Sequence, residues 1–339
     1  MSKKNTIVLN HKNCFTISKQ ISELYLDFKK KILNLRSKNF IVAVSGGPDS
    51  LALSAMCKIF ELNNKNKKFH YIHINHGIRK NSSTEAKLVK KILAKQQITL
   101  LILNNKKKII NNFQNNARKI RYSLLSQESK KRKAKLILTA HHKDDQIETF
   151  LIRLSRGSGV QGLSAMNTIS YLENKIKIFR PFLTTSKSDL ISISKKIFGT
   201  FIKDPSNQNT KYLRTNIRKL LPLFKKYGIR EDQIIKSINN LKSSSETINI
   251  YFKDIFKKIV KKRNNNYFIE KKDLFSLNVE LQLRILGSVI KQINKSYYPP
   301  RSKKLETALN FLKSSQGKQY QLGGCWLKDR SNGINIQKA

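Results

Sequence analysis

The chain contains few cysteines and no long apolar run. Its three cysteines, Cys14, Cys57 and Cys325, stand among 339 residues, and no two of them have C-x-x-C spacing. This spacing argues against a zinc ribbon, an iron–sulfur cluster or a disulfide framework, and it favours a reducing compartment. The polar N-terminus has no apolar signal-peptide core, and no uncharged apolar run approaches the length of a membrane span. We therefore expect a soluble, cytoplasmic protein with no membrane partner.

Acidic residues are also scarce, since 21 Asp and Glu stand against 68 Lys and Arg, for a formal net charge of +47. Lys, Asn and Ile are used heavily throughout, as in strongly AT-biased genomes, so composition drift is one hypothesis for part of the excess. Whatever its origin, such a charge favours a polyanionic partner, and counterion release would make binding steeply salt-dependent. Nucleic acid is the simplest partner of this kind, and a solvated basic surface is the alternative.

The most informative segment is the glycine turn, which we define as residues 45–50: Ser45, Gly46, Gly47, Pro48, Asp49 and Ser50. It lies between an apolar run at 40–44, typical of a buried parallel strand, and a helical pattern at 50–60. The two glycines let the backbone bend tightly and let an anion approach, and the following helix presents N–H groups and a positive dipole end. The pattern predicts that these six residues bind phosphate. An ordinary turn with a capping Ser or Asp is the alternative.

The glycine turn is not a Walker loop, because no glycine in the chain has both the G-x-x-x-x-G-K-S/T spacing and its Lys. Its Asp49 carboxylate would repel phosphate unless a divalent cation stood between them, so we predict Asp49 as a ligand of Mg²⁺. The S-G-G-x-D-S pattern resembles the PP-loop of the ATP pyrophosphatase families. Members of those families cleave ATP between its α and β phosphates and release pyrophosphate.

Strand and helix signals alternate along the first part of the chain. After a lead helix at 18–35, strand-like runs at 40–44, 69–74, 98–103, 135–140 and 175–179 alternate with helical patterns at 50–60, 83–95, 112–129, 145–154 and 186–197. This alternation predicts an α/β fold with a doubly wound, mostly parallel sheet that binds ligands at the carboxyl ends of its strands.

The pattern changes near residue 207. The later segments are mostly helical, at 212–227, 231–260, 277–293 and 302–312, and a hairpin is expected at 319–336. We therefore expect a catalytic domain at 1–210 and a second, smaller, mainly helical domain at 211–339. The Lys-rich stretches 257–258 and 261–263 would form solvated helix faces or a surface that faces tRNA, and the sequence leaves both interpretations open.

A second group of polar residues, at 139–149, follows the fourth expected strand and opens a helix. Asp145 and Glu148 lie three residues apart, so they share a helix face and could hold a cationic group. The same D-x-x-E spacing suits helix capping, with Asp145 as the N-cap and Glu148 folded back. A metal site on His141 and His142 is disfavoured, because adjacent residues at a strand end point apart. The R-G-S-G segment at 156–159 predicts either a loop that approaches a nucleotide or RNA, or an ordinary helix C-cap.

Six motifs in ordered succession over 40–223 make a specific resemblance. After S-G-G-x-D-S come H-I-N-H-G-I-R at 73–79, A-R-K-I-R-Y at 117–122, A-H-H-K-D-D-Q-I-E-T with the R-G-S-G segment at 140–159, R-P-F at 180–182, and D-P-S-N with Y-L-R-T-N-I-R at 204–218. Together they resemble the tRNA(Ile)-lysidine synthase family.

The resemblance implies a ligase that works in two steps. ATP would adenylate the C2 oxygen of the wobble cytidine in the isoleucine tRNA with a CAU anticodon. The ε-amine of free L-lysine would then displace AMP and leave lysidine. The amine must be neutral to attack, so the site needs a general base or desolvation near the lysine.

The resemblance also implies roles for individual residues. The glycine turn would hold the ATP phosphates and Mg²⁺, and Arg118 would stabilise charge during adenylation. Asp145, which we group with Asp49 and Arg118 as catalytic, would bind the ammonium groups of lysine together with Glu148, and Arg214 would bind its carboxylate. The nucleotide pocket would be shaped by three further residues: His73, His76 and Arg79.

The chain departs from the family pattern at three places. It reads R-T-N-I-R at 214–218 where the family usually has R-N-x-I/L-R, so Arg218 is an alternative to Arg214. Lys187 stands near an expected Arg. The chain also ends soon after the expected hairpin, so we expect no further C-terminal domain, and tRNA recognition would depend on the helical domain and on positive charge. The sequence does not predict the oligomeric state.

Two alternative functions use the same residues. One is another PP-loop enzyme, although a thiolase would need paired cysteines and an amidating synthetase would need an amidotransferase cysteine segment, and the chain has neither. The other is a non-catalytic basic RNA-binding protein. It is disfavoured because Asp49, Asp145 and Glu148 are costly on a surface that serves only to bind phosphate.

Overall fold

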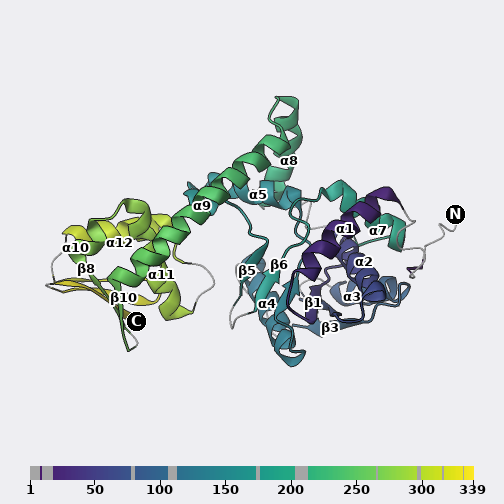
Figure 1. Ribbon diagram of the computed structural model, residues 1–339, viewed down its shortest axis with the longest axis horizontal. Coiled ribbons are helices and arrows are strands. Elements are labelled where there is room, and N and C mark those ends of the chain that lie inside the picture. Colours follow the sequence, from purple (N-terminus) through teal and green to yellow (C-terminus); the bar gives the residue numbers. More distant parts are fainter. Residues whose placement is uncertain are drawn as a thin grey trace. The chain divides into compact units, whose positions relative to one another are not determined.

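The computed structural model describes residues 8–9, 18–77, 81–105, 113–172, 176–202, 213–264, 266–295, 299–314, 317–330 and 332–339 (Figure 1). The chain forms two compact units, the first from Met1–Ile152 with Ala165–Ile235 and the second from Arg153–Ser164 with Lys236–Ala339. We expected the domain boundary at 210/211. The first unit instead continues to Ile235, within α9 (Glu231–Ile259). Helix α8 (Leu213–Lys226) belongs to the first unit, where its arginines pair with Glu148.

A six-stranded sheet with the order β3-β2-β1-β4-β6-β5 forms the centre of the first unit. Its strands are β1 (Asn39–Ala43), β2 (Lys68–Asn75), β3 (Leu100–Asn104), β4 (Leu136–Leu138), β5 (Ile169–Tyr171) and β6 (Lys177–Phe179). All pairs are parallel except β5 with β6. The five expected strands are present, and the prediction of a mostly parallel α/β sheet is confirmed.

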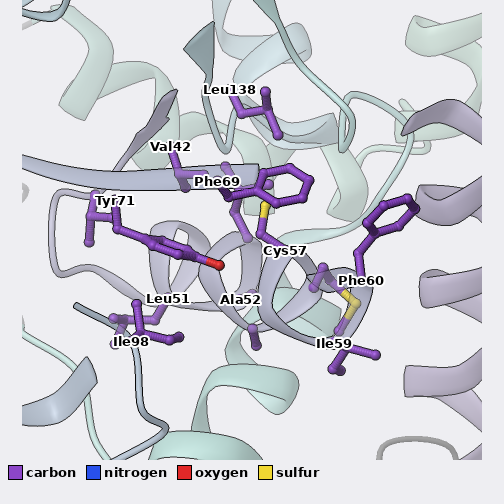
Figure 2. Close-up of a cluster of buried hydrophobic side chains, with 14 of the residues drawn as sticks. Val42, Leu51, Ala52, Cys57, Ile59, Phe60, Phe69, Tyr71, Ile98 and Leu138 are labelled. Carbon is purple, nitrogen blue, oxygen red and sulfur yellow. The ribbon is translucent and has the colours of Figure 1, made fainter. Parts of the chain in front are cut away.

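Helices cover both faces of this sheet. The helices α1 (Lys19–Leu33), α2 (Pro48–Asn63), α3 (Ser82–Ala94) and α7 (Lys187–Phe198) pack on one face, and α4 (Phe113–Lys131) packs on the other. Two further helices, α5 (Lys143–Leu154) and α8, carry the charged residues described below. Alternation along β1 separates two cores: Phe40 and Val42 pack with α1, α2, α3 and α7, whereas Ile41 packs with α4. Figure 2 shows the first core, where Tyr71 and Phe69 of β2 face α2. No helix in the described segments is long and apolar enough to cross a bilayer.

Strand β5 was not expected from the sequence. Its three residues, Ile169, Ser170 and Tyr171, are exposed or half-buried, so no side chain of the strand belongs to the buried core. Such a short edge strand carries almost no apolar alternation. Strand β5 is instead defined by its antiparallel pairing with the backbone of β6, which aligns Ile169 with Phe179.

The second unit combines helices with a five-stranded antiparallel sheet. Its remaining helices are α6 (Val160–Leu163), α10 (Lys271–Phe275), α11 (Val279–Asn294) and α12 (Ser302–Ser314). The sheet has the order β7-β8-β11-β10-β9, from β7 (Val260–Arg263), β8 (Asn266–Glu270), β9 (Gln319–Leu322), β10 (Cys325–Arg330) and β11 (Gly333–Lys338). The expected helices and terminal hairpin are confirmed. Residues 261–263 lie in edge strand β7, so their interpretation as a helix face is wrong.

Candidate functional site

The glycine turn connects the end of β1 to the start of α2. Gly46 has φ +90°, and a Cβ atom there would lie 2.5 Å from Cγ2 of Val89 on α3. Because L side chains rarely adopt this backbone conformation, both the strain and the contact require glycine. The carbonyl of Gly46 also accepts a hydrogen bond from the Ile202 N–H at 3.0 Å. The bend is therefore fixed by its neighbours as well as by its own sequence.

Ser50 closes the glycine turn from within. Its buried Oγ accepts hydrogen bonds from the backbone N–H of Ser45 at 3.1 Å and of Gly46 at 3.0 Å, and donates to the carbonyl of Gly47 at 3.0 Å. Gly47 is the N-cap residue of α2, and Pro48 is the first helical residue. Among the described residues, no side-chain hydrogen bond caps the helix at this position. A capping Ser or Asp is therefore not what ends the turn. The start of α2 remains a backbone N–H and dipole site for an anion.

Asp49 is the second residue of α2 and carries a buried atom that lacks a partner. Its Oδ1 is buried with no hydrogen-bond partner among the described residues, although the side chain as a whole is 28% exposed. Burial raises the pKa of this carboxyl, with the positive charges of His142, Lys187 and Arg218 opposing the shift. A carboxylate in this state would be stabilised by a bound cation.

The acidic helix α5 begins just beyond the carboxyl end of β4. Its first residue is Lys143, whose N–H donates to the carbonyl of Thr185 at 2.9 Å. Asp145 is the third helical residue, and its Oδ2 accepts the N–H of His142 at 3.2 Å. The alternative interpretation, with Asp145 as the N-cap and Glu148 folded back, is therefore wrong. Asp145 does bond back to the helix start, as the third residue of a capping box does.

His142 joins the glycine turn to α5. Its side chain is 3% exposed; Nε2 lies 3.4 Å from Asp145 Oδ2 and 3.7 Å from Asp49 Oδ2, and Nδ1 lies 3.6 Å from Asp144 Oδ1. Burial opposes a charge on the ring, but the contact with Asp144 and the charges of Asp145, Asp49 and Asp144 outweigh it and raise the pKa of His142. The sequence interpretation had given His142 no role. A histidine directly before an acidic first helical turn was the available signal.

His141 differs from its neighbour in charge. Its Nδ1 lies 2.9 Å from Thr139 Oγ1. Burial lowers the pKa of His141 to about 3; the charge of Asp145 opposes the shift, while Arg180, Arg118 and Arg214 add to it. His141 is therefore neutral near pH 7, whereas the raised pKa of His142 favours its cation. The two histidines face different partners, as expected for adjacent residues.

Glu148 is the centre of the charge cluster, which we define as Asp145, Glu148, Arg214 and Arg218. Its side chain is 2% exposed, and Arg218 binds both oxygens, donating from Nε to Oε1 and from Nη2 to Oε2 at 3.2 Å. Arg214 Nε lies 2.8 Å from Oε2 of the same carboxylate, and its Nη2 lies 3.9 Å from Oδ1 of Asp145. Both candidate carboxylate-binding arginines thus reach one glutamate from α8.

Asp145 keeps its negative charge in this cluster. Burial alone would raise its pKa, but the charges of His142, His141 and Arg214 and the hydrogen bond from the His142 N–H together lower it. Asp144, one residue earlier, also has a lowered pKa, because its contact with His142 outweighs burial. The start of α5 therefore presents ionised carboxylates beside a histidine with a raised pKa.

The remaining expected residues lie at several places around the sheet. The Arg118 guanidinium lies over the ring of Tyr122, 5.0 Å from its centroid, and its charge helps to lower the pKa of His141. His73 is buried on β2 and donates from Nδ1 to the carbonyl of Val44 at 2.9 Å, at the entry to the glycine turn. Burial and nearby positive charge, chiefly Arg121, lower the pKa of His76 to about 4. Arg79 and residues 204–207 lie outside the described residues.

The R-G-S-G segment ends α5. Gly157 has φ +65°, its N–H donates to the carbonyl of Leu154 at 2.9 Å, and the Ser158 N–H donates to the carbonyl of Arg153 at 3.0 Å. These two bonds form a Schellman motif, so the C-cap interpretation is confirmed. An approach of this segment to a nucleotide or to RNA stays a prediction.

Comparison with known proteins identifies the family. A family model described as a PP-loop domain matches residues 16–224. The tRNA(Ile)-lysidine synthase of Wolbachia pipientis wMel is 37% identical over 302 residues, which cover 87% of this chain and 69% of that protein. The synthase of Wolbachia sp. subsp. Brugia malayi (strain TRS) is 33% identical with the same coverage.

A solved structure supports the fold independently. The U34-tRNA thiolase NcsA from Methanococcus maripaludis matches with a TM-score of 0.55 over 70% of this chain and 86% of that chain. Its 17% sequence identity makes this a likeness of fold alone. The two relatives, by contrast, are 37% and 33% identical along 87% of this chain. This chain, with its PP-loop domain, belongs to the tRNA(Ile)-lysidine synthase family.

Proposed function

We propose that this protein is an ATP-dependent ligase that joins L-lysine to C2 of the wobble cytidine in the isoleucine tRNA with a CAU anticodon. The reaction passes through an adenylated cytidine and releases pyrophosphate and AMP. The observation that carries the proposal is the contact of both Asp49 and Asp145 with the His142 ring, at 3.7 and 3.4 Å. This contact brings a phosphate-binding turn and a cation-binding carboxylate into one site, which a ligase with these two substrates requires.

The glycine turn binds the ATP phosphates in this proposal. The backbone at the start of α2 and the missing side chains of Gly46 and Gly47 leave room for phosphate oxygens. The buried, unpartnered Oδ1 of Asp49 fits a Mg²⁺ ligand. No group of three His, Cys, Asp or Glu side chains in the described ranges has the arrangement of a metal site. Asp49 would therefore hold Mg²⁺ together with phosphate oxygens and water, and the ion would supply charge neutralisation on the phosphates.

Arg118 stabilises charge during adenylation in this proposal. Its guanidinium is oriented by the ring of Tyr122, one helical turn further along α4. Its charge also acts on His141, at the start of the acidic helix. A fixed positive group there would stabilise negative charge that develops as the cytidine oxygen attacks ATP.

The charge cluster binds lysine. Asp145, which is ionised and 13% exposed, binds an ammonium group, and the buried Glu148 adds its negative charge to the same site. Arg218 holds Glu148 through two bonds, whereas Arg214 contacts it through one nitrogen whose geometry makes no hydrogen bond. Arg214 is also the more exposed side chain of the two, at 39% against 27%. Arg214 is therefore the guanidinium that can turn to the lysine carboxylate, while Arg218 keeps Glu148 in place.

Incubation of the purified protein with ATP, labelled lysine and an isoleucine tRNA transcript tests the proposal. We expect label to enter the tRNA, with one AMP and one pyrophosphate released for each lysine incorporated. A transcript with uridine at the wobble position is the matched control and should stay unlabelled. Retained tRNA binding without lysine incorporation would instead favour the RNA-binding alternative.

A further inference from the structure

Helix α8 has two different faces. Its inner face carries Arg214 and Arg218 to Glu148 and buries Thr215 and Ile217. The opposite side, which we call the α8 outer face, consists of Leu213, Lys219, Leu220, Leu223, Lys226 and Tyr227. The spacings of 7, 3 and 4 residues from Leu213 through Leu220 and Leu223 to Tyr227 set these apolar side chains in one stripe, and Lys219 and Lys226 flank it.

The apolar stripe of the α8 outer face is exposed. Leu213 is 43% exposed, Leu220 44%, Leu223 48% and Tyr227 76%. Four large apolar side chains that lie together on one helix face indicate a binding surface, whereas single exposed apolar residues scattered over a protein do not. The end of the helix is held in place, because Gly228 has φ +82° and the Ile229 N–H donates to the carbonyl of Phe224 at 2.8 Å.

The charge around the stripe selects the kind of partner. Residues 213–230 contain no acidic side chain and six basic ones. Arg214 and Arg218 face Glu148 on the inner face and Arg230 pairs with Asp232, so the charge beside the stripe comes from Lys219 and Lys226. The Nζ of Lys226 lies 5.9 Å from the centroid of the Tyr227 ring. Exposed aromatic and apolar surface interleaved with lysines is the arrangement that binds single-stranded nucleic acid, where rings stack on bases and cations bind the backbone. Protein interfaces, by contrast, are depleted in lysine.

We propose that the α8 outer face binds the anticodon loop of the tRNA substrate, with a base stacked on Tyr227 and phosphates at Lys219 and Lys226. The inference rests on the proposed function, because the base to be modified must reach the inner face of the same helix. From Arg214 to Tyr227, which directly follows the last residue of α8, the chain rises roughly 20 Å. That length matches roughly six stacked nucleotides at about 3.4 Å each. One helix therefore serves lysine binding on one face and loop binding on the other.

Two variants test this surface, Tyr227→Ala and the double variant Lys219→Glu/Lys226→Glu. Binding is measured by fluorescence anisotropy with a labelled anticodon stem-loop and with the full transcript, in the absence of ATP and lysine. We expect Tyr227→Ala to weaken both Kd values roughly 5- to 100-fold, as loss of one stacked base does. The double lysine variant should lower the slope of log K against log salt by about 1.4, from two lost phosphate contacts on a single strand.

Matched controls come from exposed residues elsewhere. Tyr251 on α9 is 64% exposed, so Tyr251→Ala removes a similar ring outside the α8 outer face. Lys90 and Lys91 on α3 are also exposed, so Lys90→Glu/Lys91→Glu makes the same charge change. Stem-loop affinities of the α8 variants that equal those of these controls would overturn the proposal.

Other occupants of the α8 outer face would give different results. If Tyr227→Ala left RNA binding intact but changed the sedimentation coefficient or lowered Tm by several degrees, the stripe would be covered by protein and the proposal would be wrong. Loss of binding to anionic phosphatidylserine vesicles, with RNA affinity intact, would point to a membrane surface and would equally overturn it. Because these measurements need no turnover, they stand even if the wild-type protein makes no lysidine.

Discussion

The two halves of the candidate site are built differently. The glycine turn is made within six consecutive residues, where Ser50 bonds back to Ser45, Gly46 and Gly47. The charge cluster joins α5 to α8, and its central bond, from Arg218 to Glu148, spans 70 positions of sequence. The turn therefore depends on backbone conformation and steric fit, whereas the cluster depends on charge balance between distant elements. Substitutions in the two halves should therefore have different effects on catalysis, substrate binding and stability.

Asp49→Ala should have the largest effect, because Asp49 belongs to the turn and also contacts His142, which in turn contacts Asp145 of the charge cluster. We expect pyrophosphate release to fall by at least ~1,000-fold while tRNA affinity stays near that of the wild type. Asp144→Asn is the control, since Asp144 contacts the same ring through Nδ1. Wild-type turnover of Asp49→Ala would remove Asp49 from the metal role.

Glu148→Gln should break the charge cluster. We expect the KM for lysine to rise by roughly 10- to 100-fold and the KM for ATP to change much less, because the turn does not depend on Glu148. The free energy of unfolding should fall by about 2–3 kcal/mol, since two guanidiniums lose their common carboxylate.

The control for this change is Glu128→Gln on α4, where Glu128 Oε1 lies 2.8 Å from Arg132 Nε. It removes a comparable ion pair away from the cluster and should leave the lysine KM near the wild-type value. Equal effects of Glu148→Gln on the lysine and ATP requirements would mean that Glu148 serves the structure of α5 and not the substrate.

Gly46→Ala and Gly47→Ala form a matched pair that tests the turn. The first places a Cβ 2.5 Å from Val89 Cγ2 at φ +90°, and we expect it to lower the free energy of unfolding by about 3 kcal/mol. The second meets no atom nearer than Ser45 Oγ at 3.8 Å, and its stability should change by less than about 0.5 kcal/mol. Urea denaturation of both variants measures the difference, and equal losses would contradict the geometry of the bend.

The pH dependence of stability should show the smallest effect. The pKa of His142 is raised in the folded protein, so its contribution is fully present below the unfolded value and is lost as pH rises through the folded value. The wild type should therefore lose more stability than His142→Gln between about pH 6 and about pH 8. Urea titrations at both pH values measure this, and parallel losses in the two proteins would show that the three carboxylates do not stabilise the protonated ring.

Much of the fold could be predicted because it depends on local pattern. The β1 run, the glycine turn and α2 follow from apolar periodicity and glycine placement. Strands β5, β7 and β8 were missed. Ile169 and Tyr171 of β5 are exposed, and Lys261 to Arg263 of β7 carry edge charges rather than apolar alternation. Their place in a sheet comes from the neighbouring strand and leaves little trace in their own residues.

The candidate site was predictable in the same uneven way. Residue types and spacing predicted candidate side chains, from Asp49 to Glu148, because phosphate and ammonium binding need such groups near strand ends. The structure brings Asp49 and Asp145 to one histidine, and their chemical roles stay predictions. The contacts between these groups could not be predicted from the sequence. His142 lies between three carboxylates, and Arg218 is the bidentate partner of Glu148. These contacts, and the exposed stripe on the other face of α8, depend on how the elements pack together. Pairing between residues so far apart depends on how helices pack, and the periodicity of one helix does not indicate which other helix packs against it.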